Sequence, residues 1–132
     1  MTSSLQIEPN ILQISKDFKG ILLDAYGVFW GGNEAGLLPG SKGAMERLVA
    51  NGKMVGILSN STQLAEKEVN KLAQHGVLVD KHFHFLITSG ELARRIFLNK
   101  ELPFPTPHNK YWVFGQDHPR FSPHHALFQD TS

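Results

Sequence analysis

Two polar residues in this chain directly follow short apolar runs, and their side-chain types are suited to chemistry. Asp24 follows the run 20–23, and Ser59 follows the run 54–58. Short apolar runs bounded by turn residues predict buried strands. A carboxylate nucleophile beside a hydroxyl and the first amide groups of a helix is one arrangement that serves phosphoryl transfer.

The residues alone leave more than one interpretation of each position. A carboxylate buried at the end of an apolar strand costs several kcal/mol unless it is paired, hydrogen-bonded or bound to a cation. Asp24 is therefore a nucleophile or metal ligand, the cap of a local turn, or half of a structural ion pair. Ser59 either holds a phosphate oxygen with the following amides or simply caps the next helix.

The elements that must position these side chains follow from the hydrophobic pattern. Expected strands are 20–24, 54–58, 83–87 and 111–114, and expected helices are 41–51, 62–75 and 89–99. Alternating strands and helices predict an α/β fold, a Rossmann-like parallel sheet with right-handed crossovers and helices covering it. Ligands of such sheets bind beyond the carboxyl ends of the strands. Asp24 and Ser59 both fall at such ends.

Local signals refine the expected elements. Ser41 is placed to cap the first helix, and Thr88 with Glu91 three residues later is typical of a capping box. The glycine-rich stretch 27–40 predicts a loop or flap, in which Phe29 and Trp30 either line a pocket or anchor the flap. The apolar faces of the first two helices are expected at helical spacing, formed by Met45, Leu48 and Val49 and by Ala65, Val69, Leu72 and Ala73.

Composition narrows the class of protein. The chain has 132 residues with 41% hydrophobic and 19% charged residues, which suits one globular domain rather than a disordered chain. Thirteen basic residues face twelve acidic ones, so no charge pattern favours nucleic acid or an anionic membrane. Cysteine is absent, which excludes disulfides and thiol chemistry. With no long apolar run and no secretory signal, we expect a cytoplasmic protein.

The segments ILLDAYGVFWGG, LLPGSKGAMERLVANGKMVGILSNST and ITSGELARR resemble the haloacid dehalogenase-like hydrolase superfamily. They are most similar to its class IIA branch, which includes phosphatases of sugar phosphates, nucleotides and related metabolites. The resemblance runs from about residue 19 to residue 115. It implies a Rossmann-like core over 1–88 and the beginning of an α/β cap over 89–132, with the change at Thr88-Ser89-Gly90.

The resemblance also implies roles for particular residues. Asp24 would form an aspartyl-phosphate and bind Mg²⁺, and the main-chain carbonyl of Tyr26 would be a second ligand of this cofactor. Gly27 would allow a sharp turn. Ser59 would hydrogen-bond the transferred phosphoryl group, helped by the backbone of Asn60. The expected substrate is a small phosphorylated metabolite.

The sequence departs from the pattern of the family's phosphatases at two points, and both weaken the expectation of activity. The family's phosphatases carry an acid–base Asp two residues after the nucleophile, a contribution worth about 10²–10⁴-fold, whereas this chain has Tyr26. A phenol is a far weaker acid than a carboxyl group. The family's catalytic lysine and last acidic motif also have no match after Thr88. We therefore expect an incomplete chain that is weakly active or inactive; the alternative is a catalytically dead binding or regulatory module.

A second alternative lies within the same superfamily. Asp24-Ala25-Tyr26-Gly27 also resembles the opening motif of the 2-haloacid dehalogenases, which attack carbon and need no magnesium. Those enzymes insert a helical cap between the first two motifs. Here Asp24 and Ser59 are only 35 positions apart, and a flap, a helix and a strand already fill this interval. The spacing therefore disfavours a dehalogenase.

The histidines and the glycine pair of the flap are expected to have no chemical role. His82 and His84 alternate with phenylalanines and are expected on one exposed face of a strand, while His118, His124 and His125 lie near the end of the chain. Gly31-Gly32 lacks the lysine and the strand-to-helix context of a phosphate-binding loop.

An incomplete core would leave a sheet edge and a helix face uncovered. We expect a second copy of the chain, in a homodimer, to cover them.

Overall fold

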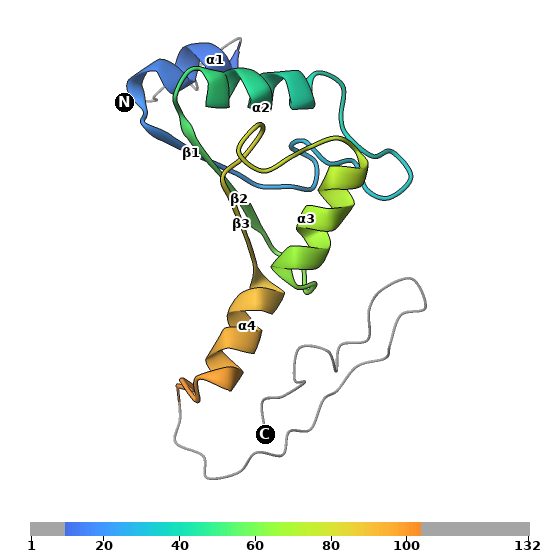
Figure 1. Cartoon of the computed structure of the whole chain (residues 1–132), viewed down its shortest axis with the longest axis vertical. Helices are drawn as coiled ribbons and strands as arrows, with labels where there is room; N and C mark the ends of the chain where they lie inside the picture. Colours follow the sequence, from blue (N-terminus) through green and yellow to red (C-terminus); the bar gives the residue numbers. More distant parts are fainter. Residues whose placement is uncertain (1–9, 104–132) are drawn as a thin grey trace, which may run out of the picture.

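The computed structural model describes residues 10–103 (Figure 1). Three strands form one sheet: β1 (Gly20–Leu23), β2 (Met54–Ser59) and β3 (Phe85–Thr88). The strand order is β1-β2-β3 and both pairs are parallel, with Leu23 opposite Ile57 and Ser59 opposite Thr88. The expected α/β architecture is confirmed for this part of the chain. The strand expected at 111–114 lies outside the described residues.

Within residues 10–103, four α-helices and one 3₁₀ turn accompany the sheet. In the described part of the chain, α1 (Ile11–Ile14) and a 3₁₀ turn (Ser15–Asp17) precede β1. Helix α2 (Ser41–Ala50) joins β1 to β2, α3 (Ala65–Gln74) joins β2 to β3, and α4 (Ser89–Leu98) follows β3. Right-handed crossovers that advance in one direction along a sheet place their helices on the same face. The topology therefore puts α2 and α3 on one side of the sheet.

Burial within β2 shows the consequence of this topology. Val55 and Ile57 are fully buried on the face that α2 and α3 cover, whereas Met54 and Leu58 on the other face are about half exposed. On β1, Leu22 is 64% exposed. The expectation that residues 20–24 form a buried strand is therefore wrong. Within residues 10–103, β1 is an edge strand, and its outer face has no helix over it.

The flap between β1 and α2 is anchored in the core. Phe29 and Trp30 are both 2% exposed, and the Phe29 carbonyl accepts a hydrogen bond from the Leu38 amide at 2.8 Å. Bridges join Trp30 to Tyr26 and to Leu37. Of the two interpretations of these aromatic residues, the structure selects the anchor. They pack with core residues of the strands and helices, which include Leu23, Met45, Leu48, Val55, Ile57 and Leu72.

Two helix starts differ from the expected caps. The residue before α2 is Gly40 in a left-handed conformation, and the Ser41 hydroxyl donates to the Leu38 carbonyl at 2.6 Å instead of capping the helix. The Thr88 hydroxyl does accept the Glu91 amide, at 3.0 Å. The Glu91 carboxylate, however, accepts the amide of Ala65 at the start of α3. The expected capping role of Thr88 is therefore confirmed, whereas the expected capping role of Glu91 in its own helix is wrong.

The last described helix does not cover the sheet, which corrects the expectation for 89–99. Figure 1 shows α4 continuing from β3 beyond the carboxyl ends of the strands, away from α1 and α2. Gly90 in its first turn is its only buried residue. Its apolar residues at helical spacing, Leu92, Ala93, Ile96 and Phe97, are half-buried.

The two histidines before β3 are not on an exposed strand face, so that expectation is also wrong. His82 is fully buried, and its Nδ1 accepts the Leu78 amide at 3.0 Å. His84 is half-buried, and its Nδ1 accepts the Val55 amide at 3.0 Å. Both residues precede β3, and both rings bind backbone groups. His118, His124 and His125 lie outside the described residues.

Candidate active site

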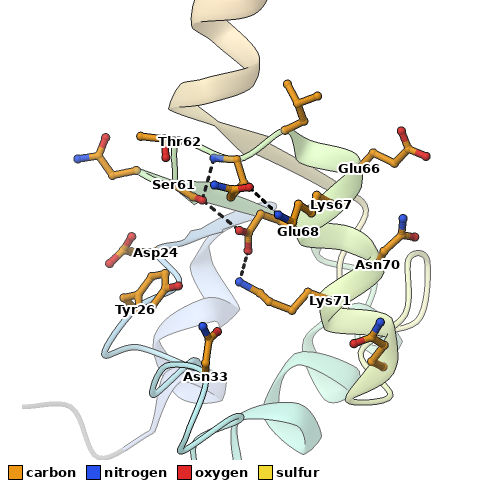
Figure 2. A pocket seen from close by; sticks show the side chains of 14 residues that line it. Asp24, Tyr26, Asn33, Ser61, Thr62, Glu66, Lys67, Glu68, Asn70 and Lys71 are labelled. Carbon is orange, nitrogen blue, oxygen red and sulfur yellow. Dashed lines mark hydrogen bonds and ion pairs between the residues drawn. The ribbon is translucent and has the colours of Figure 1, made fainter. Parts of the chain in front are cut away.

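A cleft of about 790 Å³ opens beyond the carboxyl ends of β1 and β2 (Figure 2). Asp24 and Tyr26 lie on one side of it, α3 forms the other side, and Asn33 of the flap contributes from below. Residues 60–64, which connect β2 to α3, complete the lining. The cleft is where a parallel sheet is expected to bind a ligand.

Asp24 is exposed and lines the cleft. Its carboxylate therefore avoids the burial cost that the apolar run before it suggested. The reason is that β1 is an edge strand and ends at Leu23, one residue earlier. No ion pair involves Asp24 within residues 10–103. The interpretation of Asp24 as a structural ion-pair partner thus finds no support in this part of the chain.

A tight turn follows Asp24. The Ala25 carbonyl accepts the amides of Phe29 and Trp30 at 3.1 and 2.9 Å, and the Gly27 amide donates to the Trp30 carbonyl at 2.9 Å. Gly27 has a φ of +76°, a conformation that glycine adopts readily. Tyr26 is 50% exposed, and its side chain lines the cleft beside Asp24. The turn therefore presents residues 24 and 26 on the same side of the cleft.

The oxygens at this turn match the ligand preference of Mg²⁺ in kind. Mg²⁺ prefers carboxylate and carbonyl oxygens and usually keeps several water ligands. The Asp24 carboxylate is exposed, and no backbone amide in residues 10–103 donates to the Tyr26 carbonyl. No group of three or more His, Asp or Glu side chains is arranged as a metal site within these residues. The donors thus fit a largely hydrated Mg²⁺ held by two protein oxygens.

Ser59 and Asn60 occupy different environments at the end of β2. Asn60 is exposed and lines the cleft, together with the residues that follow it. Ser59 is 6% exposed and lies among the residues of a smaller cavity next to the cleft, which Tyr26 also lines. Its hydroxyl accepts the Ser61 amide at 3.3 Å. Asn60 thus lines the cleft together with Asp24, whereas Ser59 lines the smaller cavity beside it.

A polar network on the α3 side of the cleft was not foreseen from the sequence. Glu68 is 8% exposed, accepts a hydrogen bond from the Ser61 hydroxyl at 3.0 Å, and forms an ion pair with Lys71. The Ser61 hydroxyl in turn accepts the Gln63 amide at 3.2 Å. Figure 2 shows these contacts joining α3 to the loop above it. The network fixes the conformation of residues 61–63.

Lys71 also connects α3 to the flap. Its ammonium lies 5.1 Å from the centre of the Trp30 ring and 5.8 Å from the centre of the Tyr26 ring, within the range of cation–π attraction. Glu68, Lys71 and the two aromatic residues all line the smaller cavity as well. Lys71 therefore couples the wall that carries Asp24 and Tyr26 to the opposite wall.

One signal in the sequence points to Glu68. At helical spacing it lies on the same side as Ala65 and Leu72, two residues of the expected buried stripe. A carboxylate on a buried helix face is uncommon without a partner. In the structure Ala73 of that stripe is exposed and Glu68 is buried, so the buried face of α3 is rotated toward the cleft.

The fold defines the class of protein: an α/β protein with a cleft at the carboxyl ends of a parallel sheet. Residues 21–124 match the sequence model of one family, described as haloacid dehalogenase-like hydrolase. This range is most of the chain. The chain belongs to the haloacid dehalogenase-like hydrolase family.

A solved structure supports the fold. The crystal structure of a haloacid dehalogenase-like family hydrolase from Brucella suis 1330 superposes with a TM-score of 0.61 at 19% identity. The match covers 70% of this chain and 33% of that one, so the chain spans about a third of the length of that protein. No curated protein that was compared matches the chain. None of the helices within residues 10–103 has the length and apolar character needed to cross a membrane.

Proposed function

We propose that this chain carries the nucleophile-bearing part of a Mg²⁺-dependent phosphatase of small phosphorylated metabolites, with Asp24 as the nucleophile. One observation carries the proposal. The exposed Asp24 lies at the carboxyl end of β1 and lines a cleft that Asn60 and α3 also line. We also propose that the core ends at residue 88 and that a cap begins at residue 89.

The proposed reaction has two displacements. In the first, a carboxylate oxygen of Asp24 attacks phosphorus, the ester bond to the leaving group breaks, and an aspartyl-phosphate forms. In the second, water attacks that phosphorus and releases inorganic phosphate and the free carboxylate. In this proposal Asn60 and the loop after it, which line the cleft on the β2 side, contact the phosphoryl oxygens.

Mg²⁺, when bound by the Asp24 carboxylate and the Tyr26 carbonyl, would offset negative charge that gathers on the phosphoryl oxygens. Tyr26 has a separate effect through its side chain. The leaving oxygen needs a proton, and the hydroxyl of Tyr26 is a weak donor in the position where a carboxyl group would serve well. We therefore infer that turnover by this chain is slow.

A binding or regulatory module is the second candidate function, and Tyr26 favours it. The Tyr26 side chain is half exposed in the cleft and interacts with Lys71, so it is built into the site. A chain with this residue can still bind a phosphorylated ligand without hydrolysing it. A 2-haloacid dehalogenase is disfavoured, because β1 and β2 are joined by the flap and α2 with no helical cap between them.

The test is a melting curve of the full chain with Mg²⁺ and beryllofluoride, which mimics an aspartyl-phosphate. A ligand that binds only the folded state at 100 times its Kd adds about 2.7 kcal/mol to stability and raises the melting temperature. We expect the rise to be lost in Asp24→Asn. The matched control is Asp17→Asn, which removes an exposed carboxylate outside the cleft and should keep the rise.

The outcomes separate the candidates. A rise that depends on Asp24, together with measurable release of phosphate from an aryl phosphate, supports the phosphatase. The same rise without phosphate release supports the binding module. If the wild-type chain shows no rise, or if Asp24→Asn keeps it, Asp24 is not a phosphoryl-accepting site. Chloride release from a 2-chloro acid without magnesium would instead support the dehalogenase.

A further inference from the structure

The loop that lines the cleft between β2 and α3 is held from its far side by the first turn of α4. The Ser61 carbonyl accepts both the Ser89 hydroxyl, at 2.9 Å, and the Gly90 amide, at 3.1 Å. The Thr88 hydroxyl donates to the Gln63 carbonyl at 2.7 Å. Three hydrogen bonds thus run from residues 88–90 to two carbonyls of a loop whose other side faces the cleft.

The start of α3 depends on the same turn. The residue before α3 is Leu64, which has no side-chain oxygen to cap the free amides of the first turn. The Ala65 amide instead donates to the Glu91 carboxylate at 3.2 Å, across 26 positions of sequence. An acidic group at a helix start also interacts favourably with the helix dipole. Glu91 therefore supplies the cap that α3 lacks.

Gly90 brings the two backbones into direct contact. A Cβ added at Gly90 would lie 2.2 Å from the Thr62 carbonyl oxygen and 2.9 Å from that of Gln63. These are backbone atoms, so neither can swing aside as a flexible side chain would. Any larger residue at position 90 must therefore separate residues 62–63, which line the cleft, from the first turn of α4.

We propose that Ser89, Gly90 and Glu91 are positioning residues of the cleft, and that the first turn of α4 sets where residues 61–65 stand opposite Asp24. Gly90, in this first turn, is the buried residue of α4. Figure 1 shows α4 extending from this turn, away from α1 and α2. The identity of the ligand rests on the proposed function; the coupling between α4 and the loop does not.

The primary test compares two glycine-to-alanine variants of the full, ¹⁵N-labelled chain. Gly90→Ala adds a methyl group against the Thr62 carbonyl, whereas Gly43→Ala adds one on the outer face of α2, where nothing lies within 4 Å. We expect the amide signals of Ser61, Thr62 and Ala65 to shift in Gly90→Ala and to stay in place in Gly43→Ala. The Kd for beryllofluoride with Mg²⁺ should rise at least tenfold in Gly90→Ala and stay unchanged in Gly43→Ala.

A second pair of variants tests the cap and avoids a steric change. Glu91→Gln keeps an oxygen that can accept the Ala65 amide, and Glu91→Ala removes it. Hydrogen exchange of the Ala65 amide should be at least tenfold faster in Glu91→Ala, with rescue in Glu91→Gln. If Gly90→Ala does not fold, this comparison still tests the proposal, because the Glu91 variants introduce no steric clash.

Each outcome has a definite meaning. Folded Gly90→Ala with unmoved loop signals, or with an unchanged Kd, overturns the proposal, as does equal exchange of Ala65 in both Glu91 variants. If the wild-type chain binds no beryllofluoride, the proposed function fails, while the amide shifts and the exchange rates still decide whether α4 positions the loop.

Discussion

Tyr26 is the single residue with the greatest expected effect on turnover. It lies in the cleft two residues after Asp24, where a carboxyl group could protonate a leaving oxygen. We expect Tyr26→Asp to raise Mg²⁺-dependent hydrolysis of an aryl phosphate by about 10²–10⁴-fold, the usual contribution of a general acid–base group. Steady-state phosphate release measures the change.

Two controls accompany this variant. Tyr26→Phe removes the hydroxyl without adding a carboxyl group and should not gain activity. Asp24→Asn in the Tyr26→Asp background should return phosphate release to the uncatalysed rate in buffer. A Tyr26→Asp chain that folds, binds beryllofluoride and gains no activity would show that more than this proton donor is missing.

His82 makes the stability of the fold depend on pH. Burial lowers the pKa of His82 below its ordinary value of 6.5; the hydrogen bond with the Leu78 backbone and the nearby Glu46 carboxylate oppose this, and the Lys42 and Lys81 ammonium groups reinforce it. Its Nδ1 accepts the Leu78 amide, so the ring proton is on Nε2, which is buried without a hydrogen-bond partner in residues 10–103.

The sign of the pH effect follows from the lowered pKa. The unfolded chain binds a proton at His82 as the pH falls through 6.5, and the folded chain does so only at lower pH. We expect the free energy of unfolding to fall as the pH drops below 6.5, and to change less in His82→Gln. Urea unfolding between pH 7.5 and 5.5 measures this; equal pH dependence in the two chains would contradict it.

Among the elements, α2 offers a matched pair of glycines whose substitutions should act in opposite directions. Gly43 lies inside the helix with open space around it, and Gly52 lies just after the helix with a φ of +75°. Gly43→Ala should stabilise the chain by about 0.5–1 kcal/mol, because alanine is the better helix former. Gly52→Ala should destabilise it by about 1–2 kcal/mol, because a Cβ disfavours the left-handed conformation.

Chemical denaturation of the two variants measures both changes. The space around Gly52 is also open, so backbone conformation rather than crowding separates the pair. A stabilising Gly52→Ala would mean that the chain does not turn in the left-handed region after α2.

For the whole molecule, the topology makes the two faces of the sheet unequal. Ile57 and Leu58 are neighbours on β2, but Ile57 is fully buried under the helices and Leu58 is 49% exposed on the other face. We expect Ile57→Ala to cost about 2–5 kcal/mol, as for other large-to-small changes in a core. Leu58→Ala should cost about 1 kcal/mol or less. Thermal or urea unfolding measures both.

Comparing Ile57→Ala with Leu58→Ala also tests whether anything covers the face of the sheet opposite α2 and α3. Leu22, Met54, Leu58 and Phe85 are exposed on that face within the described residues. A large loss of stability in Leu58→Ala would indicate that this face is covered in solution. The expected homodimer stays a prediction, and light scattering of the full chain at several concentrations tests it.

The sequence by itself determined the order of the elements, because apolar runs and helical spacing report local geometry. The strands at 20–24 and 54–58, the helix at 41–51 and the turn after Asp24 were all predictable to within a few residues. The Thr88 cap of α4 was also predictable, since donor and acceptor are three positions apart. Asp24 as a cleft residue followed from its position at a strand end.

Only the tertiary structure decided which partners these residues take. Glu91 caps α3 instead of its own helix, Ser59 is covered while Asn60 reaches the cleft, and Glu68 is buried with Lys71. The exposure of Asp24 depends on β1 being an edge strand of the described sheet, which no local pattern encodes. These features depend on the order of strands and on the face that each crossover helix covers. Both are fixed by packing between residues far apart in the chain.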